Sequence, residues 1–165
     1  MKNAAKFLDS ALQTILTSAL SSGGRGKGPD FNLNSFMAIL TSKFKSMNPT
    51  IRLFLIDWIN TLNEIANVDL IIYLPDILED LLFMLGDKEK LLRTSAKGCL
   101  KNFEKELEEK FSEGRLETIM GDETVDAILT ILIKVAKGKS SSHTKLVALA
   151  WFNLMFKFFK AQIEN

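Results

Sequence analysis

The glycine-rich stretch 21–30 holds the pattern in this chain that comes nearest to a phosphate-binding loop. Four glycines surround Arg25 and Lys27 there. A P-loop needs a glycine at its start and a serine or threonine directly after its lysine, so that backbone N–H groups and a hydroxyl face phosphate and magnesium. Ser21 and Gly28 occupy those two positions instead. We interpret the stretch as a flexible loop, with weak contact between its two cations and phosphoinositide headgroups as the alternative.

The other reactive residue types are too few or too dispersed to form a catalytic or metal site. His143 is the only histidine and Cys99 the only cysteine, which excludes multi-histidine metal sites and an intrachain disulfide. We expect Cys99 to be a buried, inert thiol. The acidic residues Asp76, Glu79 and Asp80 fit the start of a helix, where negative charge is favourable. The sequence therefore predicts no catalytic, cofactor-binding or metal-binding residue.

Apolar residues recur at helical spacing along nearly the whole chain, and no convincing strand pattern is present. The expected helices are 2–20, 34–47, 50–66, 70–85, 88–111, 122–137 and 143–162, with Asn34, Asn48, Asp69 and Asp122 as N-caps. Pro75 predicts a kink or a restart after Leu74. We expect the charged turns Glu104–Lys110 to project into water and the segment 112–121 to be an irregular connection.

The composition is that of a globular domain without a strong overall charge. The 165 residues fit one domain, and 21 basic against 20 acidic residues give a formal charge of +1. Such a balance favours neither nucleic acid nor an anionic membrane. The charge-free stretch Leu146–Phe156 is too short to span a bilayer, which needs about 20 residues. We expect a soluble, intracellular protein that touches membranes at most peripherally.

A basic residue followed six residues later by a buried-type residue recurs at the starts of several helices. The basic residues are Arg52, Arg93 and Lys145, and the residues six positions on are Trp58, Cys99 and Trp151. The first two basic residues are 41 residues apart, within the ~40–47 typical of HEAT and armadillo repeats. The predicted fold is therefore all-α, a solenoid of HEAT/armadillo-type helix pairs; an unrelated helical bundle with chance periodicity is the alternative.

The repeat frame predicts two kinds of contact surface. Polar residues on the second helix of each pair could face a partner: Asp57, Asn60, Glu64, Lys97, Lys101 and Glu104. The last helix is apolar around most of its circumference, which suggests contact with a further repeat or another chain through Phe156, Phe158 and Phe159. We expect these 165 residues to be a section of a longer array or to self-associate.

Several collinear blocks resemble the vacuolar-morphology scaffold family called Vac fourteen. The most specific are FLIDWINTL at Phe54–Leu62, VDLIIYLPDILEDL at Val68–Leu81 and LGD at Leu85–Asp87. Weaker blocks on either side extend the similarity over nearly the whole chain, which matches a section in the N-terminal half of that longer protein. Ala66 and Asp80 stand where the family usually has proline and glycine.

The resemblance implies a non-enzymatic HEAT-repeat scaffold. That family holds together the kinase that converts phosphatidylinositol 3-phosphate into the 3,5-bisphosphate and the opposing Sac-type phosphatase, on the cytosolic face of endosomes and the vacuole or lysosome. Three alternatives stay open: a generic HEAT-repeat adaptor, a helical lipid carrier or enzyme with an apolar cavity near Phe152, Phe156 and Phe159, and a peripheral membrane module using Arg25 and Lys27.

Overall fold

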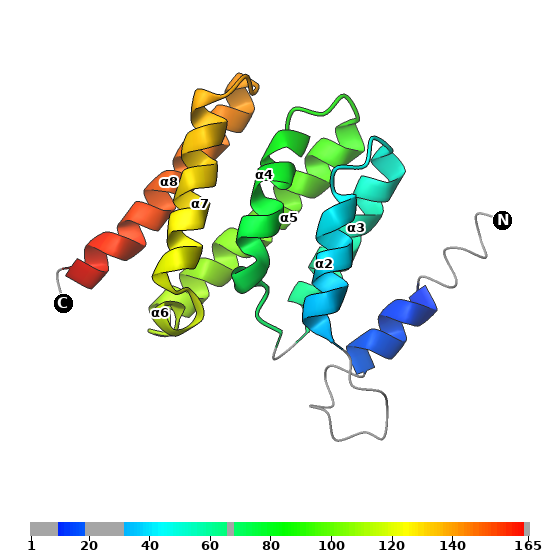
Figure 1. The fold of residues 1–165 in the computed structure, drawn as a ribbon, viewed down its shortest axis with the longest axis horizontal. Helices are drawn as coiled ribbons and strands as arrows, with labels where there is room; N and C mark the ends of the chain where they lie inside the picture. Colours follow the sequence, from blue (N-terminus) through cyan, green and yellow to red (C-terminus); the bar gives the residue numbers. More distant parts are fainter. Residues whose placement is uncertain (1–9, 19–31, 66–67, 164–165) are drawn as a thin grey trace.

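The helices of the computed structural model stack as pairs in two layers (Figure 1). The structure describes residues 10–18, 32–65 and 68–163, and within these ranges the regular structure is helical. One layer contains the first helices of the pairs, α2 (Leu33–Lys43), α4 (Leu74–Met84) and α7 (Asp122–Lys137). The other contains the second helices, α3 (Pro49–Asn63), α5 (Lys90–Ser112) and α8 (Ser142–Ile163). Residues 10–18 form a helix at the end of the row opposite α8.

Neighbouring pairs pack against each other within both layers. Helix α4 contacts α7 in the first layer, and α3 contacts α5 in the second. Inside the pairs, α2 packs on α3, α4 on α5, and α7 on α8. Each pair thus covers the apolar side of the next one, as in an α-solenoid. This arrangement confirms the predicted fold class of stacked helix pairs.

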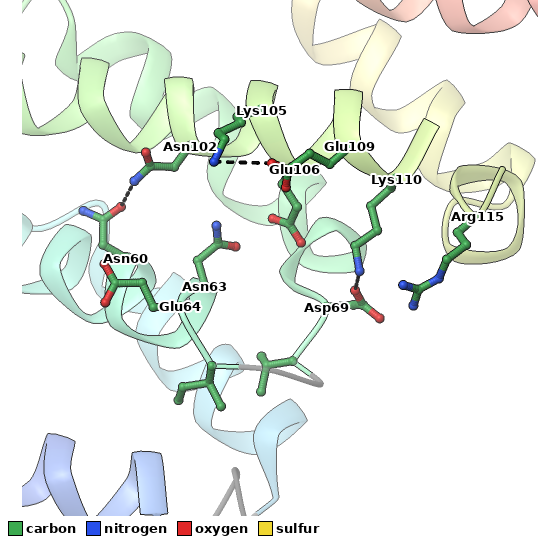
Figure 2. Close-up of a pocket in the computed structure, with 12 residues that line it drawn as sticks. Asn60, Asn63, Glu64, Asp69, Asn102, Lys105, Glu106, Glu109, Lys110 and Arg115 are labelled. Atoms are coloured by element: carbon green, nitrogen blue, oxygen red, sulfur yellow. Dashed lines mark hydrogen bonds and ion pairs between the residues drawn. The ribbon is translucent and has the colours of Figure 1, made fainter. Parts of the chain in front are cut away.

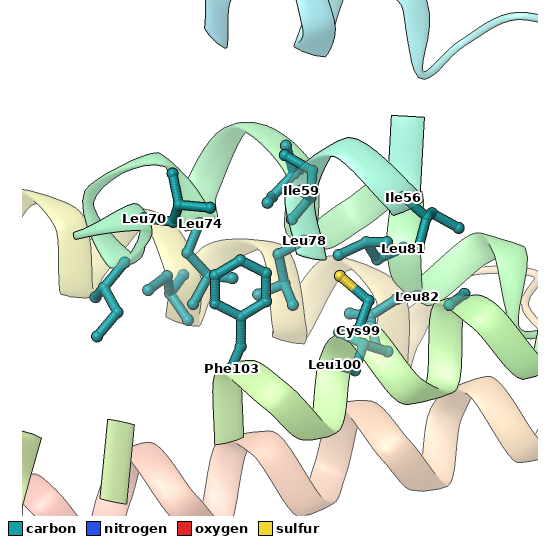
Figure 3. Packing of buried hydrophobic residues seen from close by; sticks show 14 of the residues in the cluster. Ile56, Ile59, Leu70, Leu74, Leu78, Leu81, Leu82, Cys99, Leu100 and Phe103 are labelled. Carbon is teal, nitrogen blue, oxygen red and sulfur yellow. The ribbon is translucent and has the colours of Figure 1, made fainter. Parts of the chain in front are cut away.

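The centre of the stack is helix α4, which has buried residues on most of its surface. Leu74, Leu78, Leu81 and Leu82 have no exposed surface and meet Phe103 and other apolar side chains of α5 (Figure 3). The three in-phase positions found in the sequence are also buried, namely Trp58, Cys99 and Trp151. Burial raises the pKa of the Cys99 thiol to about 12, so it stays protonated and poorly nucleophilic.

Local signals account for most helix boundaries, with some corrections. Asn48 caps α3 by accepting the Thr50 N–H, and Pro49 follows it as predicted. The restart predicted at Pro75 is also present: Leu70–Tyr73 form a 3₁₀ turn, η1, and α4 begins at Leu74. The predicted caps at two other helices are wrong: Asn32 caps α2 in place of Asn34, and Gly121 precedes α7 in place of Asp122. Asp69 is the N-cap residue of η1 as predicted, but its side chain makes no cap hydrogen bond.

The connection after α5 is more regular than expected. It contains the short helix α6 (Leu116–Ile119), which the sequence reading placed inside an irregular segment. Gly114 has a φ of 67°, a left-handed conformation that glycine adopts without steric cost, and it lets the chain turn directly after α5. Leu116 and Met120 are buried and α6 packs on α5, so apolar contacts hold this segment in place.

An ion pair links consecutive helix pairs at the turn between α4 and α5. Arg52 of α3 reaches the Asp87 carboxylate of the next pair, 2.8 Å between Nη1 and Oδ2. The other carboxylate oxygen accepts the Glu89 N–H at 2.9 Å, and Arg93 donates to the carbonyl oxygens of Asp87 and Lys88. The two in-phase arginines therefore secure the same turn, one from the preceding pair and one from its own pair.

Replacing Asp87 with asparagine should destabilise the stack. The Glu89 N–H, and next the Arg52 guanidinium, hold the pKa of Asp87 below its ordinary value. A lowered carboxylate pKa adds stability above the unfolded-state pKa, and that stability is lost as pH falls through the folded-state pKa. At pH 7 we expect Asp87→Asn to lower the free energy of unfolding by about 1.5–3 kcal/mol, the value of a hydrogen bond to a charged group.

Urea denaturation at pH 7 and at pH values below 4 measures this effect. The difference in free energy of unfolding between wild type and Asp87→Asn should become smaller as pH falls, because protonation of Asp87 removes the same charge from the wild type. Asp126→Asn, which alters an exposed carboxylate on α7, serves as the matched control and should change stability little. A free energy of unfolding for Asp87→Asn equal to that of the control at pH 7 would show that the ion pair contributes nothing.

Candidate functional site

A polar groove lies between the C-terminal halves of α3 and α5 (Figure 2). Asn60 and Asn63 border it from α3, and the residues leading into η1 close one end. Arg115, just before α6, lies at the same end as Asp69 (Figure 2). The groove has a volume of about 500 Å³, within the ~300–1,000 Å³ of typical binding pockets. It exists because α5 has 23 residues and α3 only 15, so the last turns of α5 extend past the end of α3.

Three asparagine amides line the groove wall. Asn102 of α5 donates through Nδ2 to Oδ1 of Asn60 on α3, at 3.2 Å. Asn63 lies one turn further along α3, where its Oδ1 is buried and has no hydrogen-bond partner among the described residues. An amide side chain carries both a donor and an acceptor, the same pair of groups as a peptide bond. The wall can therefore pair with polar groups of either kind.

Most of the charged residues of the groove are already paired. Lys110 binds Asp69, and Lys105 binds Glu109 at 3.3 Å. Arg115 contacts Glu113, which lies outside the groove lining, at 3.2 Å. Four carboxylates and three cations line the groove in total: Glu64, Asp69, Glu106 and Glu109, with Lys105, Lys110 and Arg115. The groove is thus slightly acidic, and its cations have partners.

Of the two groove carboxylates without an ion pair among the described residues, Glu64 is exposed and Glu106 is the partly buried one. Oε2 of Glu106 has no hydrogen-bond partner in the described part of the chain. Burial raises its pKa, and nearby Asp69 and Glu109 act in the same direction, while Lys110 and the Asn63 side chain oppose them. A buried acceptor of this kind is destabilising unless a donor reaches it. The groove therefore presents two unsatisfied acceptor oxygens, one from Asn63 and one from Glu106.

The groove brings together only part of the partner surface expected from the sequence. Asn60 and Glu64 line it. Asp57, Lys97 and Lys101 are exposed elsewhere on α3 and α5. Glu104 is half-buried, which raises its pKa, and the Trp151 indole of α8 partly offsets that rise. Glu104 thus faces its own neighbouring helix.

Sequence reasoning missed the residues that α5 contributes to this site. The charged turns at the end of α5 were expected to project into water, but Glu106 and Lys110 are half-buried and face the groove. The helical spacing alone could have indicated a shared polar face, because Asn102, Glu106 and Glu109 are four and three residues apart and lie on one side of the helix. What the sequence does not show is that the chain before η1 passes opposite that face.

The apolar contacts expected on the last helix are divided between the core and the surface. Phe158 is buried, and its ring lies 4.7 Å from that of Phe111, which corrects its assignment to an outer contact. Phe156 is 62% exposed. The side chain of Phe159 lies outside the described residues, as do the loop 21–30 and its two cations. A small apolar groove of about 180 Å³ runs between α7 and α8 and includes Phe152.

The acidic cluster noted in the sequence is split by the fold. Asp76 lies in the first turn of α4, where it is favourable to the helix dipole. Glu79 pairs with Lys134 of α7 at 2.7 Å, and burial raises the pKa of Asp80. In the described part of the chain, no three His, Cys, Asp or Glu side chains are grouped so as to hold a metal ion. None of the helices in that part is long and apolar enough to cross a membrane.

The chain is similar to curated VAC14 proteins from three organisms. The VAC14 homolog of Arabidopsis thaliana is 27% identical over 158 residues, which are 95% of this chain and 18% of that protein. The VAC14 homolog of Schizosaccharomyces pombe is 30% identical over 93 residues, 56% of this chain and 11% of that protein. The vacuole morphology and inheritance protein 14 of Saccharomyces cerevisiae is 41% identical over 64 residues, 39% of this chain and 7% of that protein.

These matches confirm the resemblance to the vacuolar-morphology family. This chain spans less than one fifth of the length of each of these relatives. No protein-family model matches the chain. No solved structure matches it either.

Replacing Glu106 with glutamine should stabilise the protein at neutral pH. A carboxyl whose folded-state pKa is raised disfavours folding once it is ionised, so its contribution to stability falls as pH rises from the unfolded-state to the folded-state pKa. Glutamine removes the charge and keeps the shape. We expect Glu106→Gln to have the higher free energy of unfolding at pH 7, with the advantage vanishing below pH ~4, near the ordinary pKa of glutamate.

Urea titrations followed by tryptophan fluorescence give this comparison directly. Glu108→Gln changes an exposed carboxylate on the same helix and is the control, with stability close to that of the wild type. If Glu106→Gln were less stable than the wild type at pH 7, the ionised carboxylate would have to be making a favourable interaction within the chain.

Proposed function

We propose, from the relation of this chain to a section of the VAC14 proteins, that it is a non-enzymatic scaffold segment. The observation that supports the proposal most is the match to the plant VAC14 homolog over 95% of the chain. A row of helix pairs agrees with this role, because repeat stacks provide extended surfaces for partner proteins. Its mechanism would be to hold partners at a fixed separation, which raises their effective concentration around each other.

The partners we propose are the pair of enzymes implied by the family resemblance. One is the kinase that forms phosphatidylinositol 3,5-bisphosphate from the 3-phosphate, and the other is a Sac-type phosphatase that reverses the reaction. The proposed location is the cytosolic face of endosomes and the vacuole or lysosome. A generic HEAT-repeat adaptor with different partners is the second reading. The apolar groove beside Phe152, at about 180 Å³, is below the range of typical ligand pockets and so gives little support to a lipid carrier.

Affinity purification of the tagged native protein from its own cells tests the partners. We expect a phosphatidylinositol-3-phosphate 5-kinase and a Sac-type phosphatase among the co-purifying proteins. A buried-core variant, Leu78→Asp, should lose both partners, because it places a charge at a fully buried position of α4. Recovery of other partner proteins without either enzyme would favour the generic adaptor and contradict the lipid-enzyme assignment.

We also propose that the outer face of α8 contacts a further repeat or a second copy of the chain. Leu146, Leu149 and Phe156 are 65%, 50% and 62% exposed, and they lie on one helix face because their spacings are three and seven. Ile133 of α7 continues this apolar surface and is 42% exposed. The pair formed by α7 and α8 is covered on one side by α4, which contacts α7. The exposed apolar face of α8 lies on the opposite side, where a further pair would pack.

Sedimentation velocity across a wide concentration range measures this association. We expect the 165-residue chain to self-associate at high concentration and to bind a hydrophobic dye. Replacing Leu149 and Phe156 with glutamine should reduce both signals. Leu91→Gln, at an exposed leucine near the start of α5, is the control and should leave both unchanged. A monomer at every concentration, with no dye binding, would contradict the proposal.

A further inference from the structure

We infer that the polar groove between α3 and α5 binds an extended segment of a partner protein that places a lysine or arginine beside Glu106. The inference rests on the proposed scaffold function and specifies the chemistry of one partner contact. Two features support it: the amides of the groove wall, and the Glu106 carboxylate, whose buried Oε2 has no hydrogen-bond partner among the described residues.

The amide wall suits the main chain of an extended peptide. In an extended strand, N–H and C=O groups are unpaired and point sideways, so they can be satisfied by a surface that offers both donors and acceptors. Asn60 and Asn102 join across the groove at 3.2 Å, and Asn63 continues the row with a buried Oδ1 that lacks a donor. A helical ligand would not use these amides, because its backbone groups are already paired internally.

One oxygen of the Glu106 carboxylate in the groove lacks a hydrogen-bond donor within the described part of the chain, and a cationic ligand could provide it. Oε2 of Glu106 is buried and has no hydrogen-bond partner among the described residues. The nearby lysines do not fill that role, since Lys110 binds Asp69 and Lys105 binds Glu109. A lysine or arginine side chain from a ligand would supply the missing donor with a complementary charge, and charge-assisted hydrogen bonds of this kind are the strong ones.

The same charges count against an anionic ligand. A phosphoinositide headgroup in this groove would lie beside Glu106 and three other carboxylates, and its phosphates would compete for cations that already have partners. Bringing like charges together in a partly buried site is costly. A basic protein segment is therefore the ligand class that the groove fits best.

Selection from a phage-displayed library of random linear 12-residue peptides tests the inference. The folded 165-residue chain is the bait, and fluorescence polarisation then gives the Kd of individual peptides. We expect the recovered peptides to share one lysine or arginine. Exchanging that residue for norleucine, or Glu106 for glutamine, should weaken binding by about tenfold or more, because each change leaves one charge without its partner. Asn63→Leu should weaken binding by removing a main-chain partner.

Matched controls separate binding from folding. Glu108→Gln alters an exposed carboxylate of the same helix outside the groove lining and should bind the peptides as the wild type does. Since Glu106→Gln is expected to be the more stable protein, weaker binding by this variant cannot be attributed to unfolding. Circular dichroism melting of Asn63→Leu provides the same check for the amide wall.

Three results would overturn the inference. The first is a selection that yields no specific peptide, and the second is peptides that bind Glu106→Gln as tightly as the wild type. The third is Glu106-dependent sedimentation of the chain with phosphatidylcholine vesicles carrying phosphatidylinositol 3-phosphate, which would mark the groove as a headgroup site. The scaffold proposal is tested separately: if both lipid enzymes co-purify with the wild-type protein while no selected peptide depends on Glu106, the groove inference fails and the scaffold function stands.

Discussion

Burial of one helix pair by the next is the constraint on which this structure depends. Helix α4 shows it most clearly, since its leucines are shared among α5 beside it, α7 in its own layer and η1 at its start. An isolated pair would expose much of that apolar surface to water, at ~25 cal/mol for each Å² left uncovered. The stack is therefore the stable unit. At its α8 end, large apolar side chains stay exposed.

Polar interactions then set the register of the pairs. The Arg52–Asp87 ion pair joins one pair to the turn of the next, and Arg93 holds that turn from its own side. The Asp87 carboxylate also accepts a hydrogen bond from the Glu89 N–H, so each of its two oxygens has a partner. Dispersion and apolar burial have little directional preference, whereas an ion pair with defined geometry allows one relative position. We attribute the alignment of the pair α2/α3 with the pair α4/α5 to this contact.

The groove follows from a mismatch in helix length. Because α5 is longer than α3, its final turns face the segment that enters η1 instead of another helix. Side chains in such a position are partly removed from water without being packed by apolar neighbours. Glu106 and Asn63 consequently keep unpaired oxygens that a ligand can use. Under the proposed scaffold function, these unpaired oxygens would lower the stability of the chain and provide contacts for a partner.

The sequence by itself determined the helical class, the repeat phase and the family resemblance. Local chemistry was sufficient for the helical class, because helix periodicity, the Asn48–Pro49 start and the Pro75 restart depend on residues a few positions apart. It did not determine which polar residues would meet. Asn60 pairs with Asn102, 42 residues away, and Lys110 reaches Asp69 across 41 residues. Only the tertiary structure decided these contacts, because helix packing sets which charged residues are removed from water and what lies opposite them.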